Sequence, residues 1–450
     1  MLTSIAVTSF ALFGFDDGKG LDKALSQELQ KQGFTGRMQN QVETRLGRLI
    51  NPKLANVGRL LWFDKIAGLN NDNTCGGCHS PTAGFGDTQS IAIGIDNNNI
   101  VGPDRKGPRN QRRTPLAINS AFYPKLMWNG RFSANSGDPF DNSLGFTFPD
   151  PEGQTLSNQS HLLRAQAFIP PTERVEAAGF HFPGTSSDIR REVIRRLNST
   201  PNYRSLFGEV YQVVRNGGSI DYDMFAAAIA EFEFTQVYAN APIDRFARGE
   251  NKAMDTDMKR GALLFFGKAG CVSCHSVSGK SNEMFSDFDN HVAAIPQIVP
   301  KQSNVTFDGP GANEDFGLEQ VTGNVNDRYK FRSSPLRNIV LQSSFFHNGS
   351  ITDLKEAIKY HVNPRKGLTQ YSTKALSQDL RNPLAPMNEP ILKLDPRLNG
   401  QVTLTGEELE NLTRFVGKGL LDQRANSNEL RRLVPNSLPS GMPPLKFQFR

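Results

Sequence analysis

Apolar residues recur at intervals of three and four positions in several parts of the chain, the spacing that places them on one face of a helix. Six segments show this pattern clearly and predict amphipathic helices: residues 21–32, 187–198, 221–238, 255–268, 353–361 and 405–422. Strict alternation of apolar and polar positions, which is typical of half-buried strands, forms no convincing series. The sequence therefore predicts an all-α fold, made mostly of helices and loops.

The two halves of the chain contain a weak repeat. In each half a predicted helix ends in a turn with glycine and leads into a cysteine-rich segment, VGRLLWFDKIAGLNNDNTCGGCH in the first half and KRGALLFFGKAGCVSCH in the second. Residues 240–252 are a predicted linker, and residues 132–160 and 276–328 are loop-rich predicted insertions. We therefore divide the chain into four parts: a signal remnant or N-terminal extension (1–20), an N-terminal domain (21–245), a C-terminal domain (246–435) and an extended tail (436–450).

The first residues and the net charge bear on location and partners. Residues 2–14 are mostly apolar but lack the basic residues that open a secretion signal, so a signal remnant, an anchor and a short packed element all stay open. No run of roughly 18 or more apolar residues occurs, so we expect no spanning helix. The formal charge is +6, but the densest basic run, RNQRR at 109–113, is short. We therefore do not expect nucleic-acid binding.

All four cysteines lie in two copies of the motif C-x-x-C-H: Cys75, Cys78 and His79 in the first copy, and Cys271, Cys274 and His275 in the second. This is the attachment signature of a c-type haem, in which both thiols bond to the haem and the histidine is its proximal iron ligand. A thioredoxin-like pair needs no histidine, a zinc site would need further ligands near each motif, and structural disulfides would not cluster in this way. We therefore predict two covalently bound haems. Such haems are attached outside the bacterial cytoplasm, which predicts a periplasmic location.

Several stretches outside these motifs resemble the bacterial di-haem cytochrome c peroxidase family, which includes the MauG-type enzymes that oxidise proteins. They are GRLLWFD, GPRNQRRTPLAINSAFYPKLMWNGR, AQAFIPPTERVEAAG, FSDFDNHVAAIPQ and YKFRSSPLRNIVLQSSFFHNGSITDLKEAI. The resemblance runs from about Gly58 to about Leu421. It implies two cytochrome-c-like domains, of which the N-terminal one holds a haem that reacts with hydrogen peroxide and the C-terminal one a haem that passes electrons.

The resemblance also assigns catalytic residues to the first haem. The family has a glutamine and a glutamate ten residues apart on the distal side of this haem, and Gln166 and Glu176 keep that spacing. Such a glutamate takes a proton from one peroxide oxygen and returns it to the departing one. Glu173 is a competing carboxylate, and either glutamate could instead be a solvated loop charge. Trp128 matches the family's tryptophan between the haems, a role compatible with that of a core indole.

Two departures from the family concern the iron ligands. Ile95 takes the place of the histidine that caps the first iron in resting peroxidases, which predicts a five-coordinate or water-bound first haem. Counting from His347, the distal ligand of the second haem is His361, where family peroxidases have methionine and MauG has tyrosine. Tyr360 and a role for His361 as a surface histidine at a helix end are the alternatives. The remaining histidines are not expected to bind iron: His291 near a haem, and His161 and His181 at the surface.

A calcium ion between the haems is also implied by the resemblance. In the family an asparagine side chain and backbone carbonyls hold it. Asn110 is the nearest candidate here, although the register from Pro115 places Arg113 at the equivalent position. Backbone carbonyls of Gln342 and Ser344 would complete the site.

These residues predict a periplasmic di-haem peroxidase that reduces hydrogen peroxide with electrons from a small donor protein, either a cytochrome c or a copper protein. A MauG-type enzyme that uses peroxide to oxidise side chains of a partner protein is the alternative, favoured by the missing capping histidine and the second haem's ligand. A di-haem electron carrier without catalytic activity is a third hypothesis, against which Gln166 and Glu176 argue.

Overall fold

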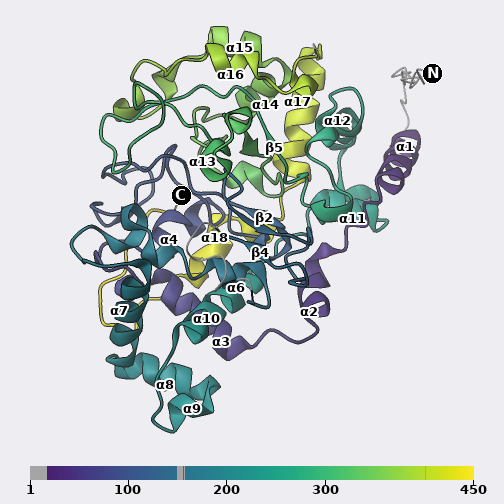
Figure 1. The fold of residues 1–450 in the computed structure, drawn as a ribbon. Helices are drawn as coiled ribbons and strands as arrows, with labels where there is room; N and C mark the ends of the chain where they lie inside the picture. Colours follow the sequence, from purple (N-terminus) through teal and green to yellow (C-terminus); the bar gives the residue numbers. More distant parts are fainter. Residues whose placement is uncertain (1–17, 149–155, 157, 401, 450) are drawn as a thin grey trace.

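A computed structural model describes residues 18–148, 156, 158–400 and 402–449 of the chain. Most of the predicted N-terminal extension (1–20) lies outside these residues. The fold is mostly helical, as the apolar periodicity predicts, with many short helical turns and loops (Figure 1). None of the described helices combines the length and the apolar character needed to cross a membrane.

The six predicted helices are all present: α1 (Gly18–Lys31), α7 (Ser186–Asn198), α10 (Tyr222–Phe234), α12 (Thr256–Phe266), α14 (Leu354–Val362) and α17 (Gly406–Arg414). Most bounds are close to those expected, but α10 ends before the predicted residue 238, and α17 gives way to a π-helical turn, Phe415–Gly419, before the predicted residue 422. The other α-helices are α2 (Gln41–Leu46), α3 (Pro52–Phe63), α4 (Cys75–Cys78), α6 (Leu162–Gln166), α8 (Pro201–Val210), α9 (Gln212–Arg215), α11 (Pro242–Ala247), α13 (Glu319–Thr322), α15 (Pro364–Gln370), α16 (Asn388–Leu392) and α18 (Ser427–Leu430).

The strands of the described residues are only two or three residues long: β1 (Ile100–Val101), β2 (Lys125–Leu126), β3 (Phe132–Ala134), β4 (Phe146–Thr147), β5 (Asn290–His291), β6 (Phe331–Arg332) and β7 (Lys446–Phe447). They form the antiparallel sheet β2-β3-β4 and the pairs β5-β6, antiparallel, and β1-β7, parallel. Such short pairings leave no alternating pattern in the sequence, which explains why the apolar periodicity did not predict them.

The described residues form two large apolar cores, one around each cysteine motif. In the first core α3 crosses α10, and a Cβ on Gly58 would lie 1.8 Å from the carbonyl oxygen of Ala228. In the second core α12 crosses α17, and a Cβ on Gly261 would lie 2.0 Å from the carbonyl oxygen of Asn411. Each crossing brings two backbones so close that only glycine fits. The weak repeat in the sequence therefore corresponds to the same helix crossing, formed once in each half.

Both ends of the described chain pack against the opposite half (Figure 1). Helix α1 lies beside α12, and its Leu25 and Leu29 belong to the second core. The C-terminal segment returns to the first half, where Leu438 joins the first core and β7 pairs with β1. The predicted limits 21–245 and 246–435 stay a prediction. The two cores follow the two halves for the most part, but Ala241 and Ile243 belong to the second core, and Met284 and Phe288 belong to the first.

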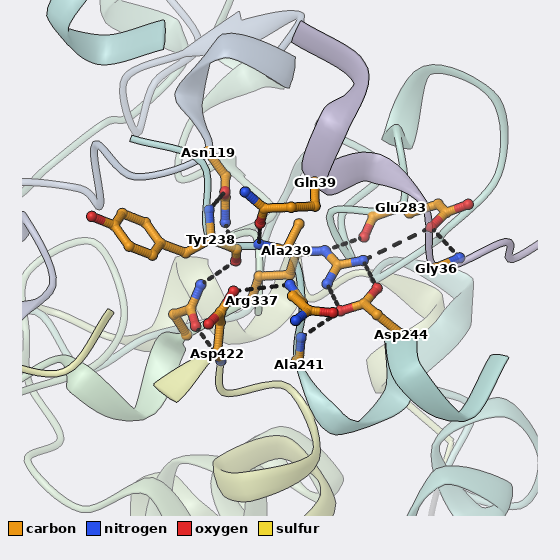
Figure 2. Close-up of polar contacts among 12 residues, drawn as sticks. Gly36, Gln39, Asn119, Tyr238, Ala239, Ala241, Asp244, Glu283, Arg337 and Asp422 are labelled. Carbon is orange, nitrogen blue, oxygen red and sulfur yellow. Dashed lines mark hydrogen bonds and ion pairs between the residues drawn. The ribbon is translucent and has the colours of Figure 1, made fainter. Parts of the chain in front are cut away.

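A buried polar junction joins the halves at the start of the predicted linker (Figure 2). Arg337 and Asp244 are both fully buried and form a two-bond ion pair, with N–O distances of 2.7 and 2.8 Å. The Tyr238 carbonyl accepts hydrogen bonds from the side-chain amides of Asn119 at 3.1 Å and Asn338 at 2.9 Å. Loss of one partner from a buried ion pair costs roughly 3–5 kcal/mol, because it leaves an unpaired charge. These contacts fix the two halves against each other.

Candidate functional site

The first C-x-x-C-H motif opens into a cavity of about 330 Å³, here named the first cavity. Helix α4 carries Cys75 and Cys78, and the Thr74 hydroxyl caps its N-terminus by accepting a hydrogen bond from Gly77. The cavity wall includes the predicted proximal and catalytic residues from four separate segments: Cys75, Cys78, His79, Trp128, Gln166 and Glu176. The structure thus brings together residues that lie up to about a hundred positions apart in the sequence.

His79 is arranged as a neutral ligand. Its Nδ1 lies 3.3 Å from the carbonyl oxygen of Phe85 and donates a hydrogen bond to it, which leaves Nε2 without its proton and available to a metal. Burial lowers the pKa of His79 to about 4, so the imidazole stays neutral at ordinary pH. The Trp62 ring packs 5.7 Å from the imidazole and restricts its orientation.

The thiols of both motifs are unpaired, as thioether attachment requires. Burial raises the pKa of Cys75 to about 12 and that of Cys78 to about 11, so both are protonated thiols before attachment. The two residues between them are packed tightly: a Cβ on Gly76 would lie 2.7 Å from the Phe63 ring, and one on Gly77 would lie 2.2 Å from Asn73 Oδ1. Close packing at this site therefore leaves room only for glycine at both positions.

Glu176 lies on a single π-helical turn, Arg174–Ala178, and lines the first cavity. Burial raises the pKa of its carboxyl to about 7, and the nearby Glu173 adds to this effect while Arg131 opposes it. Among the described residues no hydrogen bond or ion pair holds the Glu176 carboxyl. Glu173 instead pairs with Arg131 at 2.8 Å. Of the two glutamates, Glu176 is the one left free to exchange a proton.

The loop at Ile95 supports the turn that carries Glu176. The backbone N–H of Ile95 donates to the Val175 carbonyl at 3.2 Å, and a Cβ on Gly94 would lie 2.0 Å from the same oxygen. The Asn73 side chain donates to the carbonyl of Glu176 at 2.8 Å. The Ile95 side chain is buried and does not line the first cavity. The position of the family's capping histidine is therefore filled by an apolar residue that is packed away from the cavity.

Trp128 lies between the two candidate sites and lines both cavities. Its indole N–H donates to the Arg113 carbonyl at 2.8 Å, and its own carbonyl accepts from the Arg332 N–H at 2.7 Å. The indole is thus a buried, hydrogen-bonded core residue, as expected for tryptophan. The same contacts hold its ring in one place between the cavities.

The second motif opens into a cavity of about 220 Å³, here named the second cavity, with His275 and His361 on facing walls. Their ring centroids are 6.2 Å apart. Each Nδ1 donates to a backbone carbonyl, that of His275 to Phe285 at 3.0 Å and that of His361 to Ala357 at 3.2 Å, which leaves both Nε2 atoms for a metal. A metal bonded to two imidazole nitrogens at about 2 Å each holds the ring centres roughly 6 Å apart. The residues present therefore fit a haem iron with two histidine ligands.

Tyr360, the alternative ligand, is turned away from the second cavity. Its hydroxyl donates to the carbonyl of Ala294, and its ring packs where a Cβ on Gly367 would lie 2.5 Å from it. Tyr360 is buried and is not part of the cavity wall. Its hydroxyl is thus already bonded elsewhere, and the arrangement favours His361.

The remaining histidines have structural surroundings. His161 is buried, not at the surface as the sequence led us to expect: its Nδ1 accepts from the Leu163 N–H at the start of α6, and its ring packs between Phe140 and Phe234. His181 is exposed, as expected. His347 stacks on the Phe331 ring with centroids 3.6 Å apart.

His291 is held between two carboxylates beside the second motif. Its Nδ1 lies 2.9 Å from Asp395 and its Nε2 lies 2.9 Å from Asp287. Cys274, Asp287 and His291 are also the one group of metal-type side chains that lies together in the part of the chain the structure describes. Because Cys274 is a predicted haem attachment, this group is better explained as part of the second haem site: Cys274 and His291 line the second cavity, and Asp287 lies behind them as a partner of His291.

Glu233 was not anticipated from the sequence, and Arg113 was considered only as the residue at the calcium position. Glu233, on α10, lines the first cavity, and its Oε2 has no hydrogen-bond partner among the described residues. Burial raises the pKa of its carboxyl to about 8. Arg113 lines both cavities. The only sequence signal for Glu233 is a charged residue within the apolar run of α10, which does not reveal the direction in which its side chain points.

The residues predicted to bind calcium are not assembled into a calcium site. Asn110 lies on the wall of the first cavity, where its Oδ1 has no hydrogen-bond partner among the described residues. The carbonyl of Ser344 and the side-chain oxygen of Gln342 instead accept hydrogen bonds from Arg113. The ligand set therefore does not fit the ion.

Known proteins resemble this chain over most of its length. A family model described as di-haem cytochrome c peroxidase matches residues 52–252, which include the first motif. Cytochrome-c peroxidase IdrP1 of Pseudomonas sp. strain SCT is 29% identical over 374 residues, covering 78% of this chain and 84% of the relative. Methylamine utilization protein MauG of Methylorubrum extorquens is 26% identical over 313 residues, covering 70% and 69%.

Solved structures share the fold. A MauG-like protein associated with microbial copper homeostasis superposes with a TM-score of 0.59 at 21% identity, covering 84% of this chain and 91% of that one. The diheme peroxidase BthA from Burkholderia thailandensis superposes with a TM-score of 0.52 at 18% identity, covering 89% and 92%. The sequence matches and the two haem-attachment motifs support the di-haem cytochrome c peroxidase and MauG family for this chain, and members of that family bind two c-type haems.

Proposed function

We propose that this protein is a periplasmic di-haem peroxidase that reduces hydrogen peroxide with electrons from a small cytochrome c or copper protein. One observation carries the proposal: an unpaired carboxyl, Glu176, faces the same cavity as His79 and has its pKa raised to about 7. A carboxyl that titrates near neutral pH can both accept and return a proton. Membership of a family of periplasmic peroxidases supports the substrate, the kind of donor and the location.

The chain's own residues have distinct roles in this reaction. The haem on His79 would supply the redox chemistry of peroxide reduction, and the haem between His275 and His361 would supply an electron-transfer site. Glu176 would hold the proton released by one peroxide oxygen and return it to the other, which leaves as water. Gln166, on the same wall, would orient the peroxide by hydrogen bonding. Two electrons and two protons in total convert each peroxide to two water molecules.

The two haem irons would differ in whether the ligand position opposite the proximal histidine is free for peroxide. With Ile95 packed away from the first cavity, no described histidine faces His79 across it, which supports a first haem that is ready for peroxide without prior reduction. The facing histidines of the second cavity support a six-coordinate second haem of lower reduction potential than one with methionine. Trp128, which lines both cavities, would lie on the path of electrons between the two haems.

A MauG-type activity, in which peroxide is used to oxidise side chains of a partner protein, is the second candidate. The observation that favours it is the second cavity, where His361 takes the place of methionine and supports a higher oxidation state of the iron. Relatives of both kinds match this chain to a similar degree. Rapid peroxide turnover with a small donor protein supports the peroxidase; negligible turnover, combined with a long-lived oxidised state after peroxide addition, supports the MauG-type enzyme.

The experiment that tests the site compares Glu176→Gln with Glu173→Gln. Removal of a general acid–base group typically slows a reaction by about 10²- to 10⁴-fold, and we expect this loss in the rate at which Glu176→Gln reacts with peroxide in stopped-flow absorbance. Glu173→Gln loses the ion pair with Arg131 and the nearby charge that adds to the raised pKa of Glu176, but it keeps the Glu176 carboxyl and should stay within a few-fold of the unmodified protein. An unchanged rate in Glu176→Gln would remove this residue from the mechanism.

A further inference from the structure

Arg113 places a buried positive charge between the two cavities. Arg113 lines both of them, and only 3% of the residue is exposed. Nη1 donates to the backbone carbonyl of Ser344, and Nη2 donates to the side-chain oxygen of Gln342 at 2.5 Å. Arg113 belongs to the first half of the chain and both acceptors to the second. The guanidinium therefore connects the two halves at a residue that lines both cavities.

The main chain of Arg113 also connects the two halves of the chain. Its N–H donates to the carbonyl of His347 at 2.8 Å, and its carbonyl accepts from the indole N–H of Trp128 at 2.8 Å. A shift of Arg113 would consequently move the tryptophan that lies between the two predicted haems. Both the side chain and the backbone of Arg113 therefore form hydrogen bonds with residues that lie beside the cavities.

The surroundings of the guanidinium are built from oxygen atoms. Gln342 is oriented by a hydrogen bond from its Nε2 to the Ala83 carbonyl at 2.7 Å, and its amide occupies the space that a Cβ on Gly86 would need, 2.2 Å from Nε2. Its Oε1 is thereby turned towards Arg113. A carbonyl and an amide oxygen are ligand types that calcium prefers. Here both oxygens accept hydrogen bonds from the Arg113 guanidinium.

A buried carboxylate balances the charge. Asp87 is held by N–H groups of Gln89 and Thr114 at 2.9 and 2.8 Å, and the Arg113 charge lowers its pKa against the larger, raising effect of burial. Burial lowers the pKa of Arg113 itself to about 10, which leaves the guanidinium protonated at neutral pH. Arg113 is thus a permanent cation with a nearby anion, and a second cation at the same oxygens would be repelled.

We infer that Arg113 is the built-in cation of the junction between the two haem sites, and that it replaces the calcium ion expected there, so that the protein needs no divalent cation. Asn110 lines the first cavity, and it is Arg113, not Asn110, that bonds the oxygens of Gln342 and Ser344. Arg113 is a positioning residue: it holds Trp128 and joins the halves without contacting substrate.

The test uses the purified full-length protein with both haems. Its calcium content is measured by elemental analysis, and its melting temperature, haem absorbance and haem reduction potentials are compared before and after treatment with EDTA. We expect far less than one calcium per chain and no change on chelation. One tightly bound calcium per chain, whose removal alters the haem potentials or the melting temperature, would overturn the inference.

A second experiment uses Arg113→Asn. This substitution removes the guanidinium from the Ser344 carbonyl and the Gln342 side-chain oxygen, and it adds a side chain of the kind that binds calcium. We expect a melting temperature lower by about 5 °C or more, altered haem potentials, and recovery of both on addition of calcium but not magnesium, which demands smaller, more regular coordination. Arg112→Asn is the matched control: it removes the neighbouring arginine and its ion pair with Asp315, and should lose stability without responding to calcium.

Two results in this second experiment would contradict the inference. One is unchanged haem potentials in Arg113→Asn, since the cation would then have no influence on the junction. The other is an equal response to calcium in both asparagine variants. If Arg113→Asn does not fold, Arg113→Lys keeps the charge and should retain calcium independence, and the EDTA comparison on the unmodified protein decides the question. None of these measurements depends on peroxide turnover, so the proposed peroxidase activity can fail independently.

Discussion

The two halves of this protein share a scaffold but differ in what their cavities expose. Both build a core from a helix crossing that needs glycine, at Gly58 in one half and Gly261 in the other, and both place a C-x-x-C-H motif beside it. The wall of the first cavity carries the carboxyl groups of Asp64, Glu173, Glu176 and Glu233. The wall of the second cavity, within the described residues, carries none and has arginines and histidines instead.

In the proposed reaction, this difference would separate proton transfer in the first cavity from electron transfer in the second. A carboxyl such as Glu176, with its pKa raised to about 7, can move protons at neutral pH, and it faces a histidine site with an open opposite side. The second cavity has His275 and His361 on its wall and no carboxyl group among its described lining residues. A shared scaffold has thus been given two chemistries through the side chains that line its cavities.

The glycine crossings offer the strongest test of the shared scaffold. Alanine at Gly58 or Gly261 would place a Cβ within 2.0 Å of a backbone carbonyl, so the helices must separate. We expect each substitution to lower the free energy of unfolding by about 3 kcal/mol, measured in urea on the haem-loaded protein. Gly406→Ala, at the start of α17 with open space around it, should change stability by less than about 0.5 kcal/mol. A large loss in only one half would mean that the crossings are not equivalent.

Exchange of the distal ligand tests the second cavity. His361→Met should raise the reduction potential of the second haem by on the order of 0.1 V, because a thioether favours reduced iron, as measured by spectroelectrochemistry. Tyr360→Phe is the neighbouring control and removes only the hydrogen bond to Ala294. A changed haem spectrum in Tyr360→Phe, with none in His361→Met, would assign the ligand to the tyrosine.

The sequence predicted the local features of this comparison well. Apolar periodicity located five of the six main helices because each has one buried face, whereas α10 is buried on nearly all sides and shows as an apolar run. The spacing of Gln166 and Glu176 matched residues that do line one cavity. The chemistry of C-x-x-C-H needed no tertiary information, since all its groups are adjacent in the chain. His161 was misplaced because a histidine that caps a helix looks, in the sequence, like any polar residue before an apolar run.

The sequence did not predict the long-range pairings, and the reason is different. The return of β7 to β1 and the packing of α1 on α12 join segments hundreds of residues apart, and no periodic pattern encodes which partner a short segment meets. The side-chain direction of Glu233 and the partners of Arg113 depend on these tertiary contacts as well. Both residues face cavities that exist only after the halves have come together.

The pH dependence of the peroxide reaction tests the role given to the first cavity. Glu176 must be ionised to accept a proton, and its pKa is raised to about 7, so the rate should fall as the pH decreases below 7, approaching tenfold per pH unit. Above pH 7 the rate should level off. Stopped-flow measurements from pH 5 to 9 check this, and Glu176→Gln should lose the dependence. A dependence that survives in Glu176→Gln would locate the titrating group elsewhere.

The last prediction concerns Glu233, a buried acid in the wall of the first cavity. The described wall of the second cavity carries no carboxyl group, so this titration distinguishes the two cavities. The pKa of Glu233 is raised to about 8 in the folded protein, so between the unfolded value near 4.5 and pH 8 the folded state binds the extra proton and stability falls as pH rises. Glu233→Gln keeps the shape without the titration, so its stability relative to the unmodified protein should improve by about 1 kcal/mol or more between pH 6 and pH 8. Urea unfolding of the haem-loaded proteins at the two pH values measures the difference. An equal stability gap at both would mean that Glu233 is already ionised in the folded protein, and the first cavity would then hold a fixed negative charge beside Glu176.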